Sequence, residues 1–152
     1  MVVEMEIPQK LKCIWWLALE DKILTKHNLL KRRWQGPSFC PLCRQSDEIG
    51  FHLFLDCNLC LQVWRVVKEC LGISTDWGAE NLENSFSNWF QNDVSYNILL
   101  PIFISWSIWL TRNQAIILET NPISLICGII GINLFKDYET INNKKFKKNV
   151  LL

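Results

Sequence analysis

The 152-residue chain contains 49% hydrophobic and 20% charged residues and has a formal net charge of +1. The length allows one compact domain or two small lobes, and the composition excludes a wholly disordered chain. Acids stand near the start, where a signal peptide would carry basic residues before a long apolar run, so we expect an intracellular protein, nuclear or cytoplasmic. The apolar runs at residues 98–110 and 123–135 are shorter than the roughly 20 residues that span a bilayer, which predicts buried helices and no membrane contact.

Two helices are predicted before the first pair of cysteines. Apolar residues recur at helical spacing over residues 10–20. Thr25 is a suitable N-cap for a second, shorter helix through about residue 33, and the Gly36-Pro37 pair that follows stops it.

Four more helices are predicted after the cysteine pair. A third runs from about Cys57 to residue 71 and ends at Gly72, and a fourth covers residues 82–90. A longer helix is expected over residues 96–119, with Pro101 starting or kinking it. Asn121 and Pro122 suit the N-cap and first turn of a last helix that ends near residue 138, before a basic tail.

These elements predict a mostly α fold, in which a small zinc-stabilised helical domain is followed by a helical C-terminal lobe. We assign residues 7–72 to the first domain, residues 79–138 to the second, and residues 139–152 to a disordered basic tail.

Four metal-ligating residue types lie within 18 positions in the pattern Cys-x2-Cys-x8-His-x4-Cys, formed by Cys40, Cys43, His52 and Cys57. Zinc favours thiolates and imidazoles that converge from two chain segments, so the pattern predicts one zinc ion. Because protein side chains fill all four positions, no open position is left for an activated water, and we expect a structural zinc ion.

Two alternatives to this ligand set are open at this point. Cys60 could replace His52 to give a four-cysteine ribbon, although Cys60 also fits the apolar stripe of its helix. The cysteines could instead be small buried apolar residues and His52 a core histidine, which leaves the Cys-Pro-Leu-Cys turn unexplained. Cys13, Cys70 and Cys127 are expected to be core or inert residues.

The zinc pattern and its surroundings resemble the zinc-binding domain of plant non-LTR (LINE-type) retrotransposon reverse transcriptases. The resemblance covers about residues 7–70 and rests on these residues: Ile7-Pro8, Lys10, Trp16, Lys22-Ile23-Leu24-Thr25, Asn28-Leu29, Arg32, Trp34, Cys40-Pro41-Leu42-Cys43, His52-Leu53-Phe54, Cys57 and Val63-Trp64. Downstream, Trp106-Ser-Ile-Trp109-Leu-Thr-Arg112-Asn113 is similar to a helix that often follows this domain. The resemblance implies the same four ligands and does not include Cys60.

No catalytic residues and no small-molecule substrate are predicted. The acids are scattered without the paired carboxylates of two-metal chemistry, and neither a Gly-rich phosphate loop nor a Ser-His-Asp set is visible. The chain also has neither the polymerase nor the RNase H segment of a full element, so we expect a detached, non-enzymatic module.

Two kinds of partner are predicted. The segment from Lys22 to Ser46 holds basic residues and no acid, which favours weak, salt-sensitive contact with RNA or DNA. The candidate contacts are Lys22, Lys26, Lys31, Arg32, Arg33 and Arg44. The alternative is a helical scaffold that docks another protein through Phe103, Trp106, Trp109 and Trp89, or a retrotransposon remnant without a selected function.

Overall fold

The computed structural model describes residues 7–92 and 99–150, and this part of the chain is helical, with one isolated β-bridge between Phe39 and Asp47 and no strand. The mostly α fold class is therefore confirmed. In chain order the elements are α1 (Gln9–Leu19), α2 (Lys26–Lys31), the π-helix η2 (His52–Asp56), α3 (Asn58–Leu71), α4 (Leu82–Asn92), α5 (Leu100–Leu118) and α6 (Ser124–Val150).

Local signals in the sequence explain where several helices begin and end. The Thr25 side chain accepts a hydrogen bond from the backbone N–H of Asn28 and caps α2, as predicted. Gly72 ends α3 with a φ of 65°, a left-handed conformation that glycine adopts at low cost. Pro101 lies in the first turn of α5, where its missing N–H has no helical partner to lose.

The last helix differs from the sequence prediction at both ends. It begins at Ser124, because its first backbone hydrogen bond runs from the Cys127 N–H to Ile123 O. Asn121 and Pro122 therefore lie outside it. It continues past Tyr138 to Val150, so the predicted helix end near residue 138 is too early, and the assignment of residues 139–152 to a disordered tail stays a prediction. Residues 139–150 contain no Gly or Pro to stop a helix, and lysines near its C-terminus interact favourably with the helix dipole.

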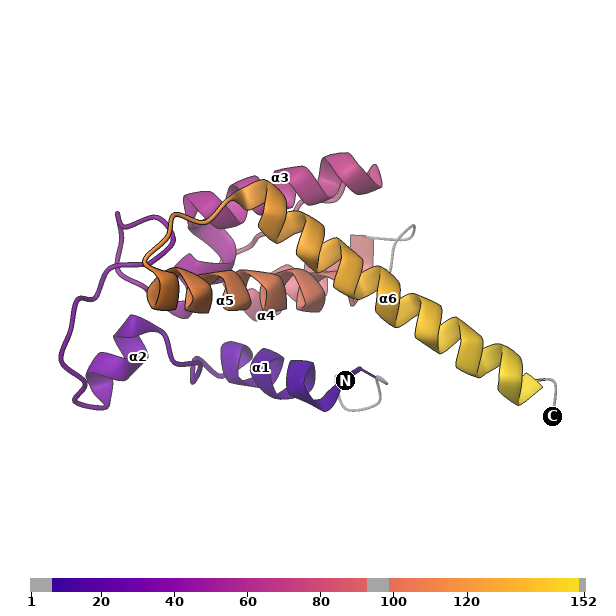
Figure 1. The fold of residues 1–152 in the computed structure, drawn as a ribbon, viewed down its shortest axis with the longest axis horizontal. Helices are drawn as coiled ribbons and strands as arrows, with labels where there is room; N and C mark the ends of the chain where they lie inside the picture. The colour runs from indigo at the N-terminus through magenta and orange to yellow at the C-terminus, as the bar shows by residue number, and fades with distance from the viewer. Residues whose placement is uncertain (1–6, 93–98, 151–152) are drawn as a thin grey trace.

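The helices pack around one hydrophobic core (Figure 1). Helix α5 lies at the centre and contacts both α1 and α6, while α6 crosses diagonally over α3 and α5 before its basic end projects beyond the other helices. The buried residues of segments 7–72 and 79–138 belong to the same cluster. The division of the chain into two domains stays a prediction.

Tryptophans account for much of this core. Trp15, Trp64, Trp77 and Trp89 come from α1, α3, the α3–α4 connection and α4, and each of these rings lies 5.3 to 6.4 Å, between centroids, from at least one other tryptophan ring. Each of these four side chains is 7% exposed or less. Aromatic burial of this size is how a small helical protein gains stability from few residues.

The aromatic residues that we expected on a partner surface are buried instead. Phe103, Trp106 and Trp109 of α5 are exposed by 8% or less, because α5 is covered by α1 on one side and by α6 on another. Trp89 of α4 is fully buried against the rings of Trp64 and Trp77. These four side chains are therefore not available on the surface of this fold, and docking of a protein partner through them stays a prediction.

Two glycines allow α6 to approach its neighbours closely. A Cβ atom at Gly131 would lie 2.7 Å from Ile104 Cδ1 and 2.8 Å from Ser107 Oγ on α5, and one at Gly128 would lie 3.1 Å from Val66 on α3. Within the described residues, no helix has the length and apolar character to cross a membrane.

Candidate metal centre and the residues around it

Cys40 and Cys43 are held in a tight turn by backbone hydrogen bonds. The Cys40 N–H donates to Ser46 O at 2.7 Å, and the Arg44 N–H donates to Cys40 O at 2.8 Å. Arg44 adopts a φ of 58°, which turns the chain back directly after the second cysteine. Both thiols therefore project from the same side of one short loop.

His52 and Cys57 stand at the two ends of the π-helix η2. The Cys57 N–H donates to His52 O at 2.8 Å and closes this wide turn, and Cys57 then acts as the N-terminal flanking residue of α3. The sequence analysis did not predict this turn before α3, because short π-helices have no clear sequence signature. They occur often at functional sites.

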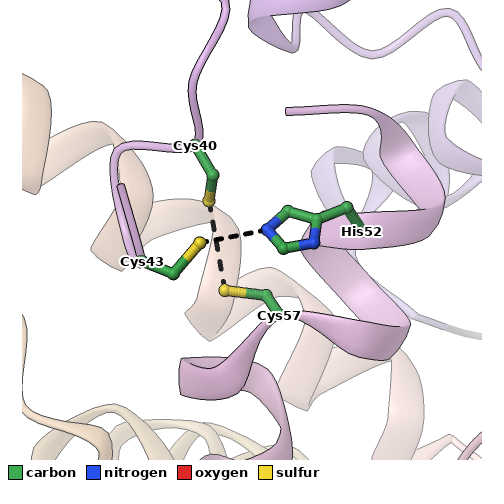
Figure 2. A group of neighbouring side chains, drawn as sticks. All are labelled: Cys40, Cys43, His52 and Cys57. Carbon is green, nitrogen blue, oxygen red and sulfur yellow. Dashed lines mark hydrogen bonds between the residues drawn. The ribbon is translucent and has the colours of Figure 1, made fainter. Parts of the chain in front are cut away.

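The structure brings all four predicted ligands together (Figure 2). Their ligand atoms lie within 4.8 Å of one another; Cys40 Sγ is 4.0 Å from Cys57 Sγ, and Cys43 Sγ is 3.2 Å from His52 Nε2. Zinc bound tetrahedrally at about 2.3 Å from sulfur would place two sulfurs about 3.7 Å apart. The observed spacing and the three-cysteine, one-histidine donor set therefore fit zinc.

Asp56 orients the imidazole ring. Its Oδ1 lies 2.7 Å from His52 Nδ1 and is placed to accept the N–H of that nitrogen, which leaves Nε2 facing the thiols. Metal-ligating histidines generally have such a partner for the second nitrogen, and it both fixes the tautomer and makes the ligand more basic. The sequence analysis did not single out Asp56, although its position four residues after His52 could have done so.

The surroundings of Cys40 disfavour the ionised form of its thiol. The hydrogen bond with Cys57 is the largest cause, and burial the next, of a pKa for the Cys40 thiol well above the ordinary range. A bound divalent cation supplies the opposite charge and replaces the thiol protons, so metal binding at this centre releases protons.

The alternative ligand Cys60 lies outside this cluster. Its thiol is fully buried and donates to Phe54 O at 2.9 Å, and burial raises the pKa of the Cys60 thiol. Cys127 is also buried, with its sulfur 3.7 Å from Ser107 Oγ, whereas Cys13 and Cys70 are exposed. The described fold therefore separates the three cysteines of the centre from the other four.

The comparison with known families agrees with this geometry. Residues 1–64 match the family described as zinc-binding in reverse transcriptase. This family is the zinc-binding segment and not the catalytic polymerase domain, and the predicted zinc cofactor is confirmed by the match together with the four-residue cluster. No curated protein and no solved structure matches the chain.

Sequence reasoning missed a buried ion pair that connects the zinc-binding segment to α5. Glu48 is fully buried, and its two carboxylate oxygens accept from Arg112 Nε at 2.6 Å and Arg112 Nη2 at 2.7 Å. The same carboxylate accepts a hydrogen bond from the backbone N–H of Lys26 at 2.6 Å, and Arg112 also donates to Leu24 O at 3.2 Å. The Arg112 guanidinium lies 4.8 Å from the centroid of the Trp109 ring.

The basic residues predicted to contact nucleic acid lie around α2 and the cysteine turn. Lys22, Lys31, Arg32, Arg33 and Arg44 are exposed, and Lys26 is half-buried. Lys22 stands 5.0 Å from the Trp16 ring and 3.8 Å from Glu20, so part of its charge is already paired. Lys26 stands 4.5 Å from the Trp34 ring.

Proposed function

We propose that the protein is a non-catalytic module in which one structural zinc ion organises a basic surface that contacts RNA or DNA. The observation that carries this proposal is the closed ligand set. Four protein side chains converge on one point, and this leaves no coordination position for a substrate or an activated water. The chemistry of such a centre is to hold two chain segments together.

The basic surface supports the nucleic-acid part of the proposal. Three consecutive exposed bases, Lys31, Arg32 and Arg33, end α2, and none of the three is paired with a carboxylate in the described part of the chain. Unpaired surface cations contribute to binding phosphates by releasing condensed counterions, which makes the affinity fall with salt.

The metal part is tested by measuring zinc in the purified protein and in two variants. His52→Ala is expected to lose zinc or bind it far more weakly, whereas Cys60→Ala is expected to keep one zinc ion per chain. Zinc loss in Cys60→Ala with retention in His52→Ala would contradict the ligand set.

The nucleic-acid part is tested by fluorescence anisotropy with a labelled single-stranded oligonucleotide at several salt concentrations. Replacing Lys31, Arg32 and Arg33 by Gln should weaken binding and lower the slope of log K against log salt by about 2, if all three contact phosphates. The matched control replaces Lys144, Lys145 and Lys147, three bases of the projecting end of α6, and should bind like the unmodified chain. Equal binding by both triple variants and the unmodified chain would argue against the proposal.

Docking of another protein is a second candidate, and one observation favours it. Apolar side chains are exposed where α5 ends and α6 begins, and the most exposed of them are Ile117 (76%), Leu118 (62%), Ile123 (58%), Ile126 (52%) and Leu125 (50%). Exposed apolar groups that cluster along one part of a chain are typical of interaction surfaces. Ile117→Lys would weaken capture of such a partner and leave zinc content unchanged.

A further inference from the structure

A groove of about 490 Å³ lies between the cysteine turn, α2 and the end of α5, and its lining includes Lys26, Phe39, Arg44 and Glu119. We propose that this groove binds a nucleotide of single-stranded nucleic acid, with the base stacked on Phe39 and the phosphates facing Lys26 and Arg44. The inference rests on the proposed nucleic-acid contact and locates it in the fold.

Phe39 has the properties of a stacking platform. Its side chain is 44% exposed although it is a large apolar group, and its backbone is fixed by the β-bridge to Asp47. The next residue, Cys40, donates its N–H to Ser46 O and carries a metal-ligating thiol. An aromatic ring held in this way binds a base face without first losing much conformational freedom, and every base has such a face.

The cations of the groove are placed for a backbone phosphate. Among the described residues, neither Lys26 nor Arg44 is paired with a carboxylate. Lys26 is held over the Trp34 ring, and a Cβ atom at Gly36 would overlap that ring, so the chain wraps closely around this aromatic residue. The fold thus places Trp34 beside Lys26, and Phe39 lines the same groove as Lys26 and Arg44.

Glu119 is the acidic residue in the lining of the groove. A carboxylate repels phosphate, but it accepts hydrogen bonds from the exocyclic amino group of a base such as cytosine. In the proposed binding mode, Lys26 and Arg44 contact the phosphates, and Glu119 together with Phe39 contacts the base; all four residues line this groove.

Zinc binding and this groove are coupled through the chain itself. Phe39 precedes the ligand Cys40, and Arg44 follows the ligand Cys43. Loss of the metal frees the turn that positions both side chains, so nucleotide binding in the groove requires zinc.

The experiment measures binding of fluorescein-labelled oligo(dC), single-stranded and as a duplex with oligo(dG), to the full chain by anisotropy. Phe39→Ala should weaken single-strand binding about tenfold, as loss of one stacked base typically does, and should leave duplex binding unchanged. Phe39→Leu, which keeps the apolar bulk without the aromatic face, should show a similar loss. Phe90→Ala is the matched control, because Phe90 has the same 44% exposure but lies on α4.

The outcomes separate this inference from the proposed function. If replacing Lys31, Arg32 and Arg33 weakens binding while Phe39→Ala and Phe39→Leu with full zinc content bind normally, the groove assignment is wrong and the proposed function stands. Equal losses for Phe39→Ala and Phe90→Ala, or an equal loss with duplex, also overturn the groove. If the unmodified zinc-loaded chain binds no oligonucleotide, both are wrong.

Discussion

The buried pair of Glu48 and Arg112 should be among the most sensitive positions of the protein. Arg112→Met keeps the apolar stem of the side chain and removes the charge, so it leaves a fully buried carboxylate with only the N–H of Lys26 as a partner. Removing one member of a buried ion pair typically costs about 3–5 kcal/mol, because the other charge stays buried without compensation. Since whole domains are stable by only about 5–15 kcal/mol, a loss of this size is a large share of the free energy of unfolding.

The double variant distinguishes an uncompensated charge from lost packing. Glu48→Leu combined with Arg112→Met leaves no buried charge, and buried pairs replaced by apolar residues are often neutral or better. The Lys26 N–H still loses its acceptor at the start of α2, which costs about 1 kcal/mol, as loss of a helix cap does. We therefore expect the double variant to be more stable than Arg112→Met alone.

The assay is urea unfolding of the zinc-loaded protein at pH 7, followed by circular dichroism. Arg65→Met on the exposed surface of α3 is the control and should change the free energy of unfolding by no more than about 0.5 kcal/mol. The reasoning is refuted if Arg112→Met costs less than about 1 kcal/mol, or if the costs of the two single variants add up in the double variant.

Three further predictions concern the metal centre and the helix packing. Asp56→Ala should weaken zinc binding by about 10- to 100-fold in a chelator competition, since His52 loses the partner of its second nitrogen; unchanged affinity would contradict this role. Burial raises the pKa of the Cys60 thiol above its ordinary value of 9.0, so the neutral thiol contributes its full stability below pH 9.0 and loses it as pH rises toward the folded-state pKa. This thiol should accordingly lower the free energy of unfolding by up to about 1.4 kcal/mol per pH unit above pH 9 in urea titrations, in addition to the contribution of the Cys127 thiol, whose pKa is also raised by burial, and Cys60→Ala should reduce the slope; an identical slope in Cys60→Ala would refute the assignment. Gly131→Ala should destabilise the protein by about 1 kcal/mol in thermal or urea unfolding despite the better helix propensity of alanine, because its Cβ meets Ile104 and Ser107; a stabilised variant would show that α6 is not closely packed there.

The metal centre could be predicted from the sequence because its ligands are close together in the chain. A Cys-x2-Cys turn and two further ligands within 18 positions need only short loops to converge. The helices could be predicted for a similar reason, since apolar periodicity, the Thr25 cap and the Gly72 terminator act over a few residues.

Long-range partners could not be predicted in this way. Glu48 stands between Asp47 and Ile49 in a stretch that resembles a polar loop, and its partner Arg112 is 64 residues further along. Nothing in local spacing distinguishes this acid from its neighbour Asp47, which is exposed. In the same way, the spacing of Trp106 and Trp109 on α5 indicates an apolar stripe but does not say that α1 and α6 cover it.

The wide turn η2 has one residue more than an α-helical turn between the last two ligands. Its hydrogen bond from the Cys57 N–H to His52 O closes one turn over five residues, whereas four residues of an α-helix, at about 100° each, also make roughly one turn. Loss of one residue between His52 and Cys57 would therefore keep both ligands on the same face. A chain with three residues between these ligands is compatible with the same centre, provided that the aspartate before Cys57 still reaches the imidazole.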